Sequence, residues 1–257
     1  MNKNEVYQIS DLKTKIVDND FATRFVSKYH YTKTCSNIVV AIGQWLDLDL
    51  KSVVVFNYCS GREMANQVID GGSNDNTLEL SRLVSFEPKP KNLESYAISQ
   101  ALKWLKENMP NIKVVISYAD NSVGHHGYIY QASNFIYYGQ SRQTIEWYLD
   151  GERIHERVLN SRYGTSSLNE LKKVLGDKIS YIKNDLTKSR YYILLSQNKK
   201  ERKELMKKIK VKPLEYPKGD NKKYNIFLNG NFSTSDKEKQ IEETRKDLTR
   251  QLSIFDL

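Results

Sequence analysis

The sequence has few of the features that mark secreted or membrane-bound proteins. It contains only two cysteines, Cys35 and Cys59, too few for a disulfide framework and without the spacing of a metal site, so a reduced cytoplasmic chain is expected. The start, MNKNEVYQISDLKTK, has no apolar stretch typical of a signal peptide. No apolar run approaches the length needed to span a bilayer. We therefore expect a soluble protein with no membrane partner.

Charge and aromatic content are present in quantity. Lys and Arg number 40 against 31 Asp and Glu, which gives a net charge of +9 and a pI near 9.2. Such a balance favours polyanions, of which nucleic acid is the usual one, although general solubility explains it as well. The 17 tyrosines against 8 phenylalanines suit half-buried surfaces that present hydroxyl groups.

Periodicity predicts a mixed α/β domain in the first two thirds of the chain. The expected elements are a helix at 18–31, a β-hairpin at 37–58, a strand at 77–86, a helix at 93–108, a buried strand at 111–120, a short helix at 127–135, and two strands within 136–159 joined at Asp150 and Gly151. The consecutive strand, loop, helix, strand and helix resemble the core of the GNAT acyltransferase fold. We expect a GNAT-like mixed central sheet flanked by helices.

Composition changes towards the C-terminus. We expect one catalytic domain over residues 1–217, which includes a lysine-dense amphipathic helix, NKKERKELMKKIKVK, as a basic extension. Residues 218–250 are polar and charged and indicate a linker, and residues 251–257 form a flexible tail.

The stretch from Ile116 to Gly139 gathers polar side chains behind a buried strand. Asp120 should emerge at the carboxyl end of that strand, where open α/β sheets bind ligands, although it also suits a helix N-cap or a turn. Gly124 and Gly127 bracket His125 and His126, which lets the backbone approach a ligand. The histidine pair would need a third ligand to hold a metal ion.

Two further places suggest anion binding. Arg82, in ELSRL, suits a phosphate or carboxylate, or else a structural ion pair; an ion pair with Glu79 would require a β-bulge. Lys89, Lys91 and Asn92 precede a helix N-terminus, which binds anions through its backbone N–H groups. FEPKPKNLES stands where a GNAT enzyme has its glycine-rich pyrophosphate signature, and this puts ordinary acetyl-CoA binding in doubt.

Five short motifs in order resemble the Mom family of phage DNA-modification enzymes. They are YHY at 29–31, ELSRL at 79–83, KNLESYAIS at 91–99, SYAD at 117–120 and GHHGYIYQASNF at 124–135. The resemblance extends over most of residues 18–217. It implies a GNAT-like transferase that adds a carbamoylmethyl group to N6 of adenine in double-stranded DNA and protects phage DNA from host restriction in the host cytoplasm.

The resemblance also implies site residues. The matching catalytic positions are His30, Tyr31, Arg82, Ser95, Asp120 and Tyr130, with Lys91, Asn92 and Ser95 beside the cofactor and Tyr31, His125 and Tyr130 beside the substrate. Asp120 can take the proton of the adenine amine, Arg82 and Ser95 can hold an anionic donor or DNA phosphate, and Tyr31 and Tyr130 can sandwich an extruded base. The donor is unidentified: an acyl-CoA-like or other activated glycine-type molecule fits, and the Tyr-His-Asp constellation admits a bound iron.

Two C-terminal features indicate partners. The lysine helix, with Lys203 and Lys207, can follow DNA phosphates, although a solvated surface helix is the plainer interpretation. QLSIF at 251–255 resembles the peptide by which bacterial proteins dock on the DNA polymerase sliding clamp, with Gln251, Leu252, Ile254 and Phe255 as contacts. A chance pentapeptide, or a tail strand that folds back, also fits.

Two other functions remain open on the sequence. One is a GNAT N-acetyltransferase that acts on a small amine or a protein, which the altered pyrophosphate loop disfavours. The other is a non-enzymatic, clamp-associated DNA-binding protein, which would leave Arg82, Asp120 and His125 without a task.

Overall fold

The computed structural model describes residues 7–236 except 31, 33, 36, 62, 87–88, 122–124, 142–143, 155, 185–186, 219–222 and 229–230. The chain divides into two compact units. The main unit contains Met1–Gly139 and Ser189–Leu257, and the inserted unit contains Gln140–Lys188. The sequence analysis did not separate the inserted unit from the domain it placed at 1–217.

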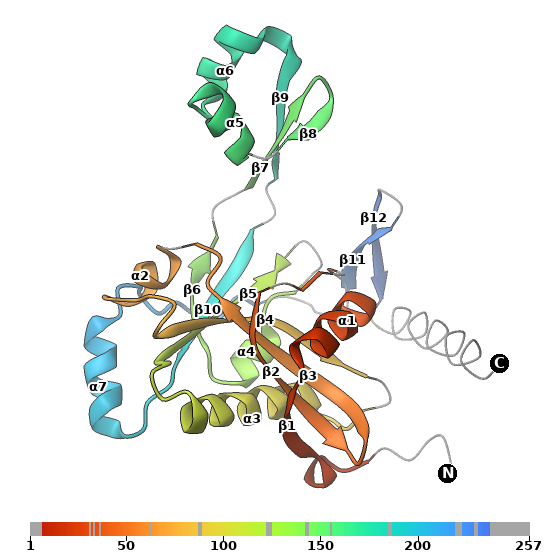
Figure 1. The fold of residues 1–257 in the computed structure, drawn as a ribbon, viewed down its shortest axis with the longest axis vertical. Helices are drawn as coiled ribbons and strands as arrows, with labels where there is room; N and C mark the ends of the chain where they lie inside the picture. The colour runs from red at the N-terminus through yellow and green to blue at the C-terminus, as the bar shows by residue number, and fades with distance from the viewer. Residues whose placement is uncertain are drawn as a thin grey trace, which may run out of the picture. The chain divides into compact units, whose positions relative to one another are not determined.

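The main unit is built on a seven-stranded mixed sheet, which confirms the predicted fold class (Figure 1). The strand order is β1-β2-β3-β4-β5-β10-β6. The strands are β1 (Lys13–Val17), β2 (Ile38–Leu46), β3 (Asp49–Tyr58), β4 (Thr77–Ser85), β5 (Val114–Asp120), β6 (Ile136–Gln140) and β10 (Lys188–Leu194). Strands β1 to β4 pair antiparallel, and β4 pairs parallel with β5.

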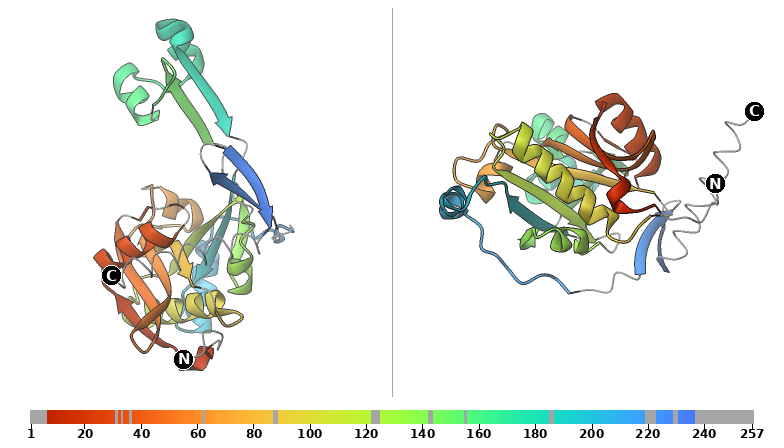
Figure 2. Two further views of the ribbon diagram at one scale, coloured as in Figure 1. Left: turned by 90° about the vertical axis from the view of Figure 1, so that its right-hand side faces the viewer. Right: turned by 90° about the horizontal axis from the view of Figure 1, so that it is seen from below.

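Helices cover both faces of this sheet (Figures 1 and 2). They are η1 (Ile9–Asp11), α1 (Asn19–Tyr29), α2 (Met64–Val68), α3 (Leu93–Asn108), α4 (Tyr128–Ala132) and α7 (Lys199–Lys208). The larger core lies between α3 and the face that carries Val54 and Phe56. The opposite face packs against α1 near β2 and β3, and against α2 and α7 near β5, β10 and β6.

Local sequence signals explain the two helices that bear on the site. Asp18 caps α1 by accepting a hydrogen bond from the Phe21 N–H at 2.9 Å, as its position before the apolar repeat predicts. Helix α3 spans the predicted residues and buries one apolar stripe that includes Ile98, Leu102 and Leu105. The consecutive β4, α3, β5 and α4 provide the predicted GNAT-like core.

The inserted unit has its own sheet and core. Its three strands run in the order β8-β7-β9, namely β7 (Thr144–Leu149), β8 (Glu152–Ile154) and β9 (Ile179–Asn184), with α5 (Glu156–Tyr163), α6 (Leu168–Leu175) and η3 (Gly176–Lys178). Trp147, Leu159, Leu171 and Ile179 are buried together. The predicted turn at Asp150 and Gly151 is present, but the expected strand after it ends at Ile154, and residues 156–163 are helical because Leu159 packs on Leu171.

Two expectations about the C-terminus have separate outcomes. Within the expected linker, β11 (Lys223–Leu228) and β12 (Asn231–Asp236) form a two-stranded antiparallel hairpin, which the polar composition did not indicate. Residues 251–257 lie outside the described residues. In the part of the chain that the structure describes, no helix has the length and apolarity to cross a membrane.

Candidate active site at the fork of strands β4 and β5

Strands β4 and β5 separate in the middle of the main sheet. Their parallel pairing begins at Thr77 and Val114 and ends at Leu80 and Ser117, although β4 continues to Ser85 and β5 to Asp120. A β-bulge lies at the point of separation, because Phe56 of β3 pairs with Leu80 whereas Val55 pairs with Arg82, which leaves Ser81 as the extra residue. Bulges bend a strand and re-aim its side chains. The fork is therefore built into the register of β4.

The bulge places Glu79 and Arg82 on the same face of the sheet. Glu79 pairs with Asn57, and Arg82 pairs with Val55, two residues earlier on β3. The sequence analysis required such a bulge before these two charges could approach each other, and the structure provides it. Both side chains are partly exposed, so this face is open to solvent beside the fork.

Arg82 contacts the main chain of two elements. Its Nε donates to the carbonyl oxygen of Thr34 at 3.0 Å, and its Nη1 donates to the carbonyl oxygen of Ser81 at 2.7 Å. Thr34 belongs to the loop between α1 and β2. The guanidinium thus joins that loop to the bulge, and the anion contact that the sequence suggested stays a prediction.

His30 lies at the other end of the same loop segment, as the residue that ends α1. Its Nδ1 lies 2.9 Å from Oγ1 of Thr32 and accepts a hydrogen bond from the Thr32 N–H at 3.2 Å. Oγ1 of Thr32 is in turn 3.3 Å from the carbonyl oxygen of Thr34. Tyr31, the other predicted residue here, lies outside the described residues.

Asp120 ends β5, at the carboxyl edge where the sequence predicted it. Its side chain is partly exposed, and its carbonyl oxygen accepts from the His125 N–H at 3.1 Å. The next residue, Asn121, accepts from the Ser189 hydroxyl at 3.1 Å, which ties this edge to β10. The carboxylate and His125 thus belong to one short loop at the end of β5.

Tyr130 reaches the fork from α4 on the opposite face. Its ring packs against Phe135 and Tyr191, with centroids 5.5 and 5.4 Å away. Burial raises the pKa of its phenol, a hydrogen bond with Ser117 lowers it, and the charges of Glu79 and Arg82 act with opposite signs. Its hydroxyl is therefore the part of Tyr130 that is directed at the fork, whereas neighbouring rings cover its ring.

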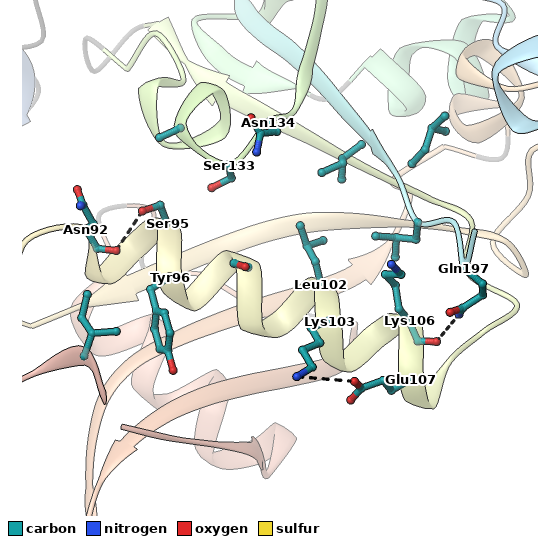
Figure 3. Close-up of a pocket in the computed structure, with 16 residues that line it drawn as sticks. Asn92, Ser95, Tyr96, Leu102, Lys103, Lys106, Glu107, Ser133, Asn134 and Gln197 are labelled. Atoms are coloured by element: carbon teal, nitrogen blue, oxygen red, sulfur yellow. Dashed lines mark hydrogen bonds and ion pairs between the residues drawn. The ribbon is translucent and has the colours of Figure 1, made fainter. Parts of the chain in front are cut away.

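A groove of about 820 Å³ runs between α3, the end of α4 and β10 (Figure 3). Asn92 and Ser95 lie at one end of it, with Ser133 and Asn134 facing them from α4, and Lys106 and Gln197 lie at the other end. The Ser95 hydroxyl donates to the Asn92 carbonyl oxygen at 3.0 Å. Two predicted cofactor residues thus line one cavity, and Lys91 is exposed beside it.

The N-terminus of α3, where the sequence predicts anion binding, begins after Asn92 and lies beside an ion pair. Asn92 adopts a left-handed conformation, with φ 67°, and makes no side-chain cap. Lys89, the nearest partly buried cation, forms an ion pair with Glu94 in the first turn of the helix. Because that pair is already neutral, a highly charged donor gains little here, which agrees with the altered FEPKPKNLES loop.

The predicted lysine-dense helix is confirmed as α7. It follows β10 in the sequence, far from β4 and β5, which form the fork. Leu205 and Ile209 pack on the core beside α2, whereas Lys203 and Lys207 are exposed on the other side of the helix. The Lys207 ammonium contacts Glu204 at 2.9 Å. A Glu201 carboxylate held by Lys113 at 2.7 Å fixes the start of the helix.

The described residues do not support a metal centre made of three His, Cys, Asp or Glu side chains, since no such group comes together among them. Tyr31 and the 122–124 loop are outside that description, so bound iron stays a prediction.

The sequence analysis did not propose three residues at the fork as site residues. They are Ser117, Tyr118 and Glu79, the last of which it considered only as an ion-pair partner of Arg82. Burial raises the pKa of the Tyr118 phenol, and Tyr138 and the Glu79 carboxylate add to the rise. The Ser117 hydroxyl is buried and donates to the carbonyl oxygen of Leu80 at 2.7 Å, across the last paired position. The sequence signal that could have identified them is the polar pair Ser117 and Tyr118 within an otherwise apolar strand.

Comparison with known proteins agrees with the predicted resemblance. The chain is 31% identical over 216 residues to the methylcarbamoylase mom of Escherichia phage Mu, covering 82% of this chain and 86% of the relative. Among solved structures, it is similar to a Bacillus subtilis acetyltransferase in complex with CoA (TM-score 0.37, 15% identity, 72% and 99% of the two chains) and to a Vibrio cholerae spermidine N-acetyltransferase in complex with CoA and spermine (0.41, 11%, 73% and 98%). These low TM-scores say nothing about activity.

The sequence profile of the Mom protein family matches residues 11–218, which include β4 and β5 of the fork and α3, α4 and β10 beside the groove. This chain belongs to the Mom protein family.

Proposed function

We propose that this protein is a DNA-modifying transferase that adds a carbamoylmethyl group to N6 of adenine and so shields the DNA from restriction. The observation that supports this most strongly is the identity to a methylcarbamoylase along most of both chains. The fork is compatible with it, because β5, which ends at Asp120, separates there from β4, which carries Arg82, and the Tyr130 phenol lies by Ser117.

Asp120 is the proposed proton acceptor. The N6 amine of adenine is a weak nucleophile, since its lone pair is delocalised into the ring, and it must lose a proton when the new N–C bond forms. A partly exposed carboxylate at the end of β5 can approach an extruded base and take that proton. As the N–C bond forms, the bond between the carbamoylmethyl carbon and the rest of the donor breaks, and that remainder leaves with the electron pair.

The groove beside α3 is the proposed donor site. Its walls at the α3 N-terminus are polar but uncharged, with Asn92, Ser95, Ser133 and Asn134 as hydrogen-bonding groups. Such walls suit an amide-bearing donor better than a bare pyrophosphate. If an acyl-CoA-like molecule binds, we expect its phosphates to contact Lys91 or Lys106, because Lys89 already pairs with Glu94.

Duplex DNA is the proposed substrate, and we propose that its phosphate backbone contacts α7. The helix presents exposed lysines, while its Leu205 packs, partly buried, against the core. Such charges release counterions when they contact phosphates.

We also propose that QLSIF binds the bacterial sliding clamp. The support is the residue pattern alone, Gln251, Leu252, Ile254 and Phe255. These residues lie outside the described part of the chain.

Mass spectrometry of nucleosides tests the activity. DNA from bacterial cells that express this protein should contain an adenine nucleoside heavier by a carbamoylmethyl group. Asp120→Asn should lower its amount at least about 100-fold, within the range of lost acid–base catalysis, whereas Asp47→Asn, in the exposed β2–β3 turn, should not. Unmodified adenine together with acetyl-CoA turnover on amines would instead indicate an acetyltransferase.

A further inference from the structure

Arg82 is the centre of a hydrogen-bonded chain that ends at His30. From the bulge outwards, the Ser81 carbonyl accepts from Arg82 Nη1 and the Thr34 carbonyl accepts from Arg82 Nε. The Thr34 carbonyl also lies 3.3 Å from Thr32 Oγ1, which is 2.9 Å from Nδ1 of His30. Because Nδ1 also accepts from the Thr32 N–H at 3.2 Å, the single proton of the Thr32 hydroxyl is shared between Nδ1 and the Thr34 carbonyl oxygen.

This chain joins two parts of the sequence that also share a hydrophobic cluster, through Val26, Cys35 and Val84. His30 and Thr34 belong to the connection between α1 and β2, whereas Ser81 and Arg82 are in the middle of β4. The bulge makes this join possible, since it pairs Arg82 with Val55 of β3 and so places Arg82 on the sheet face that packs against α1. A planar guanidinium with donors in fixed directions is suited to hold two carbonyl groups at once.

We propose that Arg82 is a positioning residue, which holds the His30 loop against the β4 bulge and thereby fixes the His30 imidazole beside the fork, rather than a residue that binds donor or DNA phosphate. Two of its donors are committed to main-chain oxygens at 2.7 and 3.0 Å. Its charge also reaches into the loop: burial raises the pKa of the neighbouring Cys35 thiol, and Arg82 lowers it.

Hydrogen exchange tests this proposal without requiring activity. In Arg82→Ala the amides of Thr32, Thr34 and Cys35 should exchange at least about tenfold faster, since the loop loses its tie to the sheet. Arg82→Lys, which can reach one carbonyl, should give intermediate rates. Arg24→Ala removes an exposed arginine from α1 and should leave these rates unchanged. Wild-type exchange in a folded Arg82→Ala variant would overturn the proposal.

A double-mutant cycle tests the link to His30, and this second arm depends on the proposed DNA modification. Arg82→Ala should lower kcat about 100-fold, as a misplaced catalytic group does, with KM for DNA changed less than about threefold. Adding it to His30→Ala should cost little more than His30→Ala alone. Losses that multiply, or a large rise in KM, would show direct binding by Arg82. If the wild type modifies no DNA, the proposed function fails while the exchange result still decides the role of Arg82.

Discussion

At the scale of a single residue, Gly127 shows how one backbone position supports the fork. It has φ +80°, and a Cβ added there would come within 2.4 Å of the Tyr191 ring. Tyr191 is fully buried, donates to the His126 carbonyl and packs on Tyr130. The sequence analysis assigned this glycine to close approach of a ligand, whereas in the structure the close neighbour is a core tyrosine.

Gly127→Ala should therefore destabilise the protein by about 2–4 kcal/mol, because the left-handed backbone conformation and the overpacking against Tyr191 both oppose a side chain. Gly71→Ala is the matched control: its φ is +69°, but nothing lies within 4 Å of the added Cβ. It should cost only about 1–2 kcal/mol. Urea denaturation of both variants measures the difference, and equal losses would show that Tyr191 gives way.

At the scale of an element, α7 has one side that packs on the core and another that presents lysines to solvent. The side with Leu205 and Ile209 holds the helix on the core, while Lys203 and Lys207, four residues apart, share the exposed side. Charge on that side can thus be removed with little effect on folding.

The double variant Lys203→Gln/Lys207→Gln should keep the fold and reduce the salt dependence of DNA binding. If each lysine contacts one phosphate, the slope of log K against log salt should fall in magnitude by about 1.8. Lys13→Gln/Lys15→Gln removes two exposed charges from β1 and should leave the slope as it is. Equal slopes in all three proteins would leave α7 as a solvated surface helix.

Elements were predictable where their signals are local. Asp18 and the apolar repeat after it define α1, and the stripe of Ile98, Leu102 and Leu105 defines α3. The bulge at Ser81 was not predictable, since it is a property of the register between β3 and β4 and not of ELSRL alone. Helix α5 was taken for a strand because its helical state depends on Leu159 packing against Leu171.

At the scale of the whole molecule, the resemblance predicts site residues along the sequence but does not say how they lie in space. His30 and Arg82 are linked indirectly, through the Thr32 hydroxyl and the Thr34 carbonyl, while Ser95 lines the groove and Asp120 ends β5. The inserted unit escaped prediction because its boundaries at residues 140 and 188 have no compositional change. The strands of the inserted unit continue the alternation of apolar and polar residues that begins in β6, the strand before it.

Residues 251–257, the C-terminal tail, determine whether the whole protein has the proposed clamp as a partner. Deleting residues 251–257 should abolish co-elution with the bacterial sliding clamp and leave DNA modification by the purified protein unchanged, because a tether raises local concentration without taking part in the reaction. The substitution Phe255→Ala should have the same effect within the full-length chain. Clamp co-elution that survives both changes would remove this partner.

The position of β10 imposes an order on synthesis. This strand lies between β5 and β6 in the main sheet, yet it is translated only after the whole inserted unit. Until Leu194 has left the ribosome, β6 has no neighbour in the sheet and β5 is an open edge, while the inserted unit already contains every residue of its own core. The insertion can thus fold first, and the sheet that carries the fork is closed last.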